Sequence, residues 1–285
     1  MTAGDTTPTF SPEDGLLRLP PAALGALAAW GERPETPKLR ADSPETIHLL
    51  SKLGVAGPHG LHPLLEPMAT TLARPLVRLR LRVGTPAPPL EVSGWIVPGW
   101  AVFSLPVSGK ADLRDIVAVH PTRLPGMIAT VVSLGPRPGL CLPGPVILPT
   151  AAARALIFEQ GGLDSRSVLS AAGVEEPWHE ALERLAALRI RTWSARSTWP
   201  LGNEVASRRV RVIDGGEAGL WLWTDATIEG RPVTQLTAVV PAVVWGHVTA
   251  LLPDADDFAS VEARAPGAAA LEPSGSPLGS TSTWA

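Results

Sequence analysis

The sequence predicts an α+β fold with an antiparallel sheet, built from two similar halves. Two observations predict it. Five short segments recur in the same order in the two halves of the chain, and each half has the expected element order helix–helix–three strands–helix. Because helices and strands are grouped instead of alternating one by one, we expect the strands to pair through hairpins and not through parallel βαβ crossovers.

The recurring segments lie 119 to 130 residues apart. Their shared order indicates an internal duplication, with half-repeats at about 15–135 and 145–254. The five pairs are 19–27 with 148–156, 50–55 with 169–174, 78–83 with 208–213, 99–103 with 219–223, and 119–132 with 239–252.

The elements of each half follow from local patterns. An Ala/Leu-rich helix that begins near a proline opens each half, since proline is tolerated in the first helical turn. A second helix is indicated by apolar residues at spacings of three and four, namely Trp178, Leu182, Leu185 and Leu188. The Asp-Gly-Gly segment at 214–216 is a turn signal, which we place between the first two strands of the second half. A short helix after a proline closes each half.

The two ends of the chain differ in composition from the rest. Residues 1–14 are polar and proline-rich, and residues 259–285 are rich in Ala, Gly, Pro and Ser without periodicity. Such segments bury too little apolar area to offset their chain entropy. We therefore expect both ends to be disordered and one folded domain to span residues 15–258.

Composition limits the functional classes. Hydrophobic residues make up 45% of the 285-residue chain, and the formal net charge of −3 contrasts with the basic surplus of dedicated nucleic-acid-binding proteins. A single cysteine, Cys141, excludes an intramolecular disulfide and a cysteine-rich zinc site. The N-terminus lacks the pattern of a signal peptide, and the longest apolar stretch, 239–252, is too short to cross a bilayer. These features predict a cytoplasmic protein that does not insert into membranes.

The sequence contains no motif of a catalytic, cofactor or metal site. Lys110 lacks the upstream glycine of a phosphate-binding P-loop, and no Gly-x-Ser-x-Gly nucleophile elbow occurs. His59 and His62 lie in a loop without a carboxylate at ligand spacing, which favours surface or capping roles. His179 lacks the second histidine of a zinc-protease helix, and Cys141 lacks a base partner and is expected to pack as a small apolar side chain. We therefore predict no enzyme, no cofactor and no metal.

Arginines alternate with apolar residues in two predicted strands. Arg78, Arg80 and Arg82 project from one face of the first, and Arg209 and Arg211 do the same in the second half. Three interpretations are open: a solvated sheet face, a docking surface for an acidic or polar partner, and a nucleic-acid site. The third is disfavoured because no aromatic residues interleave with the arginines.

The aromatic composition is also unusual, because the chain has ten tryptophans and no tyrosine. We expect most of them in the core. Trp95 with Trp100, or Trp221 with Trp223, are candidates for an interface, where tryptophan is enriched. Together with the five arginines, Trp221 and Trp223 form the predicted partner-binding set.

Several segments occur in an order that is typical of one known family. A Leu-Pro-Ala helix at 19–30 is followed by GLHPLL at 60–65, a Val-x-Pro-led helix at 119–132, Ala-Gly-Val at 172–174, and a closing strand and helix at 236–252. In this order and at this length the chain resembles the EspG family, the cytosolic secretion-associated proteins of actinobacterial ESX (type VII) systems. The resemblance covers about residues 15–254.

The resemblance implies a pseudo-two-fold fold with a central antiparallel sheet flanked by helical bundles. It also implies a chaperone that binds the helical tip of a secreted PE–PPE or WXG100-type heterodimer, keeps it soluble and delivers it for export. Segments 192–196 and 219–221 depart from the family's Gln-Phe-Gly and Gly-Arg-Tyr elements, so the client stays unassigned. The sequence does not indicate the oligomeric state. The alternative is an enzyme or small-molecule-binding protein with a site that the sequence does not reveal.

Overall fold

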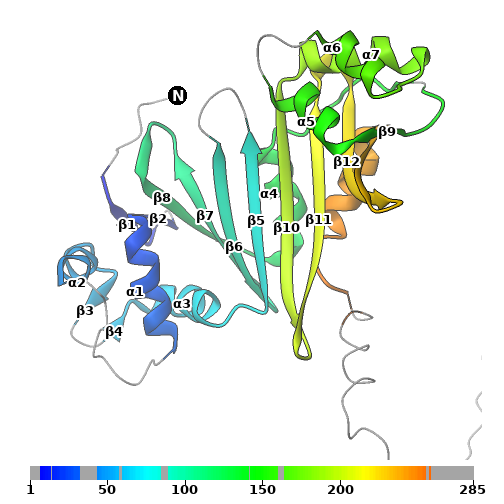
Figure 1. Cartoon of the computed structure of the whole chain (residues 1–285). Helices are drawn as coiled ribbons and strands as arrows, with labels where there is room; N and C mark the ends of the chain where they lie inside the picture. Colours follow the sequence, from blue (N-terminus) through cyan, green and yellow to red (C-terminus); the bar gives the residue numbers. More distant parts are fainter. Residues whose placement is uncertain are drawn as a thin grey trace, which may run out of the picture.

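The fold is built on a large antiparallel sheet (Figure 1). The computed structural model describes residues 7–13, 15–32, 44–57, 60–84, 89–140, 142–159, 164–254 and 257. Within these residues eleven strands form one sheet, and β3 (Ala56–Gly57) and β4 (Gly60–Leu61) form a separate ribbon. The eleven strands are β1 (Thr9–Ser11), β2 (Leu16–Leu19), β5 (Val77–Gly84), β6 (Leu90–Val97), β7 (Trp100–Val107), β8 (Lys110–Val119), β9 (Val146–Pro149), β10 (Arg191–Leu201), β11 (Glu204–Asp214), β12 (Leu220–Ile228) and β13 (Arg231–Val239).

Eight α-helices are found in the described residues. They are α1 (Pro21–Glu32), α2 (Pro44–Lys52), α3 (Glu66–Ala73), α4 (Leu124–Val131), α5 (Thr150–Phe158), α6 (Ser165–Ala171), α7 (Glu176–Leu188) and α8 (Pro241–Thr249). Short 3-10 turns precede α3 and α4, and a third, η3 (Gly216–Ala218), joins β11 to β12. None of these helices is long and apolar enough to span a membrane.

The strand order is symmetric about the centre of the sheet. It runs β1-β2-β8-β7-β6-β5-β10-β11-β12-β13-β9, so β5 pairs with β10, and β6, β7, β8 and β2 have their counterparts in β11, β12, β13 and β9. Apart from β1 and the β3–β4 ribbon, which occur in the first half alone among the described residues, each half has the element order strand, three helices, four strands, helix. The predicted fold class, a pseudo-two-fold α+β fold with a central antiparallel sheet, is confirmed.

The expected number of elements in each half was too small. Each half has four long strands instead of three, and three helices before them instead of two. Strand β10 shows why periodicity underestimates the sheet. Its buried positions include Ala195 and Ser197 beside Trp193 and Trp199, so a small and a polar residue weaken the apolar alternation.

Four of the five recurring segment pairs fall on equivalent elements, and one does not. Segment 78–83 lies in β5 and segment 208–213 lies in β11, whereas the symmetric counterpart of β5 is β10. The error has a simple origin, because the Arg/apolar alternation recurs in the two strands that flank β10 in the sheet. The turn at 214–216 is likewise displaced: it joins β11 to β12, the second and third long strands, while Gly202 and Asn203 join β10 to β11.

Part of the N-terminal segment that we expected to be disordered is ordered. Thr9–Ser11 forms β1, which pairs with β2 at the edge of the sheet. Its Phe10 packs against the apolar cluster around α1 and makes an edge contact with the ring of His62, with centroids 5.2 Å apart. One aromatic side chain thus anchors a segment whose composition is otherwise polar. The predicted tail at 259–285, His59 and Cys141 lie outside the described residues.

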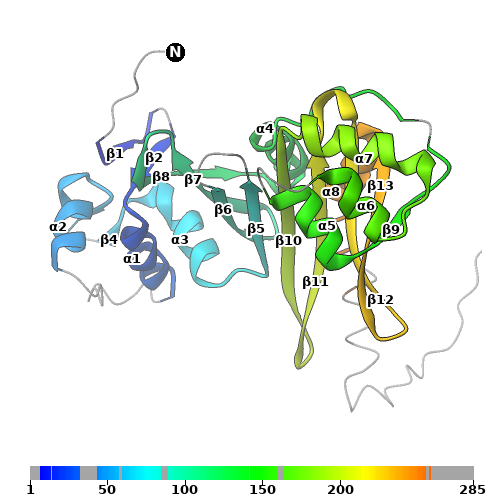
Figure 2. The same cartoon turned by 45° about the horizontal axis from the view of Figure 1, so that its top comes forward.

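Helices cover the two faces of the sheet unevenly (Figures 1 and 2). On one face α4 and α8 lie over the middle, where Leu79 and Leu81 of β5 pack in the same cluster as Ile128 and Val244. On the other face α1 and α3 pack on β7 and β8, and α5, α6 and α7 pack on β12 and β13 at the opposite end. The middle of this second face, over β5, β10 and β11, carries no helix among the described elements.

Candidate partner-binding face

The uncovered middle of the sheet is lined by arginines. Exposure alternates strictly along β5: Arg78, Arg80 and Arg82 are exposed, and the residues between them are buried. The same side of the sheet continues onto β10 and β11. We call the six residues Arg78, Arg80, Arg82, Arg196, Arg209 and Arg211 the arginine face.

The register of the three central strands brings these side chains into rows. Arg196 of β10 lies directly opposite Arg80 of β5 and directly opposite Arg209 of β11. Residues opposite each other in antiparallel strands have Cβ atoms about 4.5–5.5 Å apart. In the next row, Arg82 and Arg211 flank Ser194. The predicted arginines of the two halves therefore lie together in the folded protein.

Arg196 is a member of the face that the sequence did not reveal. It lies in β10, whose buried positions alternate but include the small Ala195 and the polar Ser197, so the apolar pattern in the sequence is weak. Only the pairing register of β10 with β5 places Arg196 on this face, and that register depends on contacts between residues far apart in sequence.

Only part of the positive charge on this face is neutralised. Arg82 Nε lies 2.8 Å from Glu91 Oε1, and Arg211 forms an ion pair with Asp225. Within the described ranges, Arg78, Arg80, Arg196 and Arg209 have no carboxylate partner; Arg196 donates to the Ser207 hydroxyl at 3.4 Å. The face therefore carries an excess of positive charge although the whole chain has a net charge of −3.

The pKa of Arg209 is lowered chiefly by burial, and the neighbouring cations add to the shift. Burial lowers it below the usual value, and the charges of Arg211 and Arg196 lower it further, while Asp225 partly opposes them. Each neighbouring cation makes the charged form of Arg209 less favourable. A negative group brought to this face would relieve that repulsion.

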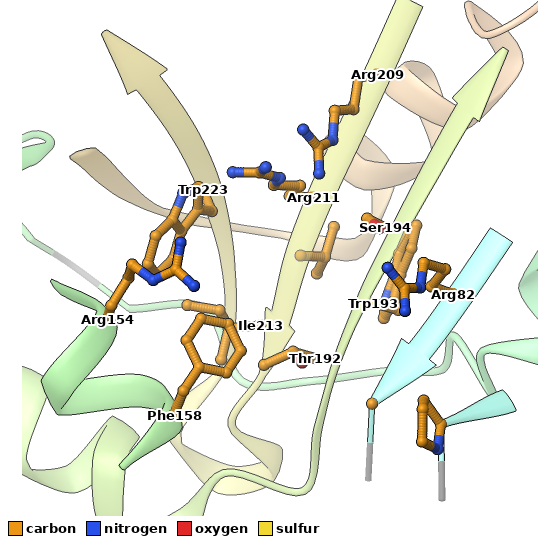
Figure 3. Close-up of a pocket in the computed structure, with 13 residues that line it drawn as sticks. Arg82, Arg154, Phe158, Thr192, Trp193, Ser194, Arg209, Arg211, Ile213 and Trp223 are labelled. Carbon is orange, nitrogen blue, oxygen red and sulfur yellow. The ribbon is translucent and has the colours of Figure 1, made fainter. Parts of the chain in front are cut away.

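Two hollows open onto the arginine face. Between α5 and the sheet lies a pocket of about 360 Å³, which we call the α5 pocket (Figure 3). Its lining includes Arg82, Arg154, Phe158, Arg209, Arg211 and Trp223. A second hollow of about 370 Å³ lies toward β6 and is lined by Arg78, Arg80, Trp95 and Arg196, among others.

The two predicted tryptophans have different positions. Trp221 is fully buried, and its indole N–H donates to the carbonyl oxygen of Ala218 at 2.8 Å. It is a core residue and cannot contact a partner from that position, so this prediction was wrong. Trp223 is only 8% exposed, but it borders the α5 pocket. Its indole N–H donates a hydrogen bond to the carboxylate of Asp225.

The histidines singled out in the sequence have structural contacts. His62 Nδ1 accepts a hydrogen bond from the Leu64 N–H at 3.4 Å, which caps the turn before α3. His179 is buried, and its Nε2 lies 2.9 Å from the carbonyl oxygen of Val174. In the described part of the chain, no three His, Cys, Asp or Glu side chains are grouped so that they could hold a metal.

The fold is similar to a known secretion chaperone. It matches a chain in the structure of the Mycobacterium tuberculosis type VII secretion system chaperone EspG5 in complex with the PE25–PPE41 dimer, with a TM-score of 0.59. The match covers 84% of this chain and 97% of that chain at 12% sequence identity. The sequence itself matches no family model and no curated protein. The similarity is thus one of fold, and it agrees with the EspG-like architecture.

Proposed function

We propose that the chain is a cytosolic secretion-associated chaperone, not an enzyme, that binds a helical secreted client through the arginine face. One observation carries the proposal: among the described residues, no helix covers the middle of the sheet between the two helical bundles, and four arginines there have no carboxylate partner. A fold can serve many functions, so the argument rests on this surface and not on the fold alone.

The chemistry of the arginine face suits the tip of a helical bundle. The carbonyl groups at the C-terminus of a helix carry partial negative charge, and arginine pairs with carboxylates through two parallel hydrogen bonds. Arg80, Arg196 and Arg209 form a row in which adjacent side chains could meet such groups together. The flanking bundles would hold the tip from both sides.

The client we propose is a secreted heterodimer of PE–PPE type or a related WXG100-like protein. The EspG5 chain to which the fold is similar was solved with a PE25–PPE41 dimer. Neither a nucleic acid nor a membrane is part of the proposal, and no cofactor is required. An actinobacterial type VII secretion system is the setting in which such a chaperone would act.

The test is co-purification of candidate heterodimers, followed by titration calorimetry with the arginine variants. Arg80→Glu should weaken client binding by at least about tenfold, because loss of a desolvated charge pair costs ~2–5 kcal/mol. Arg123→Glu is the matched control, since Arg123 is exposed in the turn before α4 and lies outside the arginine face. His62→Ala and Cys141→Ala should bind like wild type.

The opposite pattern would refute the proposed face. If Arg80→Glu and Arg123→Glu bind the client equally well while His62→Ala abolishes binding, the client docks near residues 57–63. The arginine face would then be a solvated surface.

A further inference from the structure

The α5 pocket differs from the rest of the arginine face in being enclosed by a helix as well as by the sheet. Arg154 and Phe158, one helical turn apart on α5, face Arg209 and Arg211 of β11 across the hollow (Figure 3). Its volume of about 360 Å³ lies in the range of pockets that hold small molecules, roughly 300–1,000 Å³.

The charges around the pocket do not cancel. Four arginines line it, and two of them have carboxylate partners, Arg82 with Glu91 and Arg211 with Asp225. Arg154 and Arg209 have none among the residues that the structure describes. Four arginines and two carboxylates leave a net charge of two positive units at the pocket, which one bound dianion would neutralise.

One wall of the pocket is apolar. Phe158 is 53% exposed, although large apolar side chains are usually covered, and its ring packs against Trp223 with centroids 5.7 Å apart and planes tilted by 52°. The hydroxyl-bearing residues Thr192 and Ser194 lie on the sheet side. The pocket thus combines two guanidinium groups that have no carboxylate partner in the described part of the chain, hydroxyl groups and an accessible aromatic ring.

We propose that the α5 pocket binds a small phosphate monoester. The phosphate pairs with Arg154 and Arg209, and the apolar part of the molecule lies against Phe158. A phosphate monoester is a dianion above its second pKa of about 6, and arginine binds its oxygens through paired hydrogen bonds. This assignment does not rest on the chaperone function, because it concerns only the charge and shape of the pocket.

The test is titration calorimetry of the full chain with simple probes at a pH near 7.5 and low salt. Phenyl phosphate should bind with one-to-one stoichiometry. It should bind more tightly than inorganic phosphate, which lacks the ring, and than benzenesulfonate, which carries one negative charge. Arg154→Gln and Arg209→Gln should each weaken phenyl phosphate binding about tenfold, as expected for loss of one charged hydrogen-bonding group. Arg123→Gln, which removes an exposed arginine elsewhere, should change nothing.

The variant Phe158→Ala distinguishes specific binding in the α5 pocket from nonspecific attraction of anions to positive charge. It should remove the advantage of phenyl phosphate over inorganic phosphate while leaving inorganic phosphate binding unchanged. Both Arg154 and Phe158 are exposed, so these variants should fold. The assignment is overturned if phenyl phosphate shows no saturable binding, if benzenesulfonate binds equally well, or if Arg123→Gln weakens binding as much as Arg154→Gln.

Discussion

Arg137 donates two hydrogen bonds of 2.8 Å to the carboxylate of Asp214, and this pair ties the segment between the two halves to the end of β11. The Asp214 side chain is only 3% exposed. It also accepts from the Gly216 N–H at 3.0 Å and lies 3.7 Å from Arg191, which in turn donates to the carbonyl oxygen of Val132 beyond α4. One buried carboxylate thus connects three separate segments of the chain.

Replacing Asp214 should destabilise the protein strongly. Asp214→Asn leaves Arg137 and Arg191 without their negative partner, and breaking a buried ion pair typically costs ~3–5 kcal/mol. Urea unfolding followed by circular dichroism would measure the loss. The control is Glu217→Gln in the same turn, because Glu217 is 85% exposed and its contact with Arg184 at 3.9 Å should contribute little. Equal midpoints for the two variants would contradict the role of Asp214.

The same carboxylate should make stability depend on acid pH. Burial raises the pKa of Asp214, but hydrogen bonds from Arg137 and Gly216 and the nearby arginine charges outweigh it, so the pKa lies below the ordinary value. The ionised group therefore stabilises the folded state fully above the unfolded pKa of about 3.9, and the contribution is lost as pH falls from there through the folded pKa. The stability difference between wild type and Asp214→Asn should be constant from about pH 5 to 7 and shrink below about pH 4. A difference that stays constant to about pH 3 would argue against this origin.

Local patterns in the sequence predicted some of these features and not others. The alternation of Arg78, Arg80 and Arg82 is a property of one strand, so a period of two was enough to place them on one face. The pairing of Asp214 with Arg137, 77 residues away, depends on tertiary contacts that no local pattern encodes. Asp214 was therefore recognised only as part of a turn.

The candidate site was incomplete for a similar reason. Arg154 lies on a helix that the sequence predicted, but nothing in the spacing indicated that α5 would face β11 across a pocket. Trp221 was chosen because tryptophan is common at interfaces, yet its strand position faces the helical bundle and it is fully buried. Residue type alone did not distinguish the core from the surface.

Close packing of α1 on α3 should make Gly31 intolerant of a side chain. A Cβ at Gly31 would overlap the carbonyl group of Ala69 and lie 2.7 Å from the backbone nitrogen of Thr70. Because these are backbone atoms, the helices would have to separate, and overpacking of this kind costs about 1–3 kcal/mol or more. Gly31→Ala should therefore lower the melting temperature.

Gly25 provides the matched control for this effect in the same helix. It is exposed, and no heavy atom lies within 4 Å of the position that its Cβ would occupy. Alanine favours helix over glycine by up to ~1 kcal/mol, so Gly25→Ala should leave the melting temperature unchanged or raise it. If both variants melt at the same temperature, α1 and α3 are not in the close contact described.

Charge repulsion within the row of arginines across β5, β10 and β11 should destabilise the folded protein. Arg196 lies between Arg80 and Arg209, and like charges directly opposite each other in a sheet are destabilising by a few tenths to ~1 kcal/mol. We predict that Arg196→Gln raises the melting temperature by roughly 1–4 °C, since ~1 kcal/mol shifts a protein of this size by about 2–4 °C. Differential scanning calorimetry at low salt would measure the gain.

The salt dependence of the melting temperature distinguishes charge repulsion from other causes of a higher melting temperature in Arg196→Gln. The Debye length falls from about 30 Å at 0.01 M to about 3 Å at 1 M ionic strength, so the advantage of Arg196→Gln should shrink as salt is added. Arg123→Gln, on an exposed turn away from the row, should show no gain at either salt concentration. A lower melting temperature for Arg196→Gln at all salt concentrations would mean that Arg196 makes stabilising contacts that exceed the repulsion. If instead Arg196→Gln is more stable and binds the client more weakly, the row opposes folding and favours binding, which is the behaviour expected of a surface whose charges serve a partner.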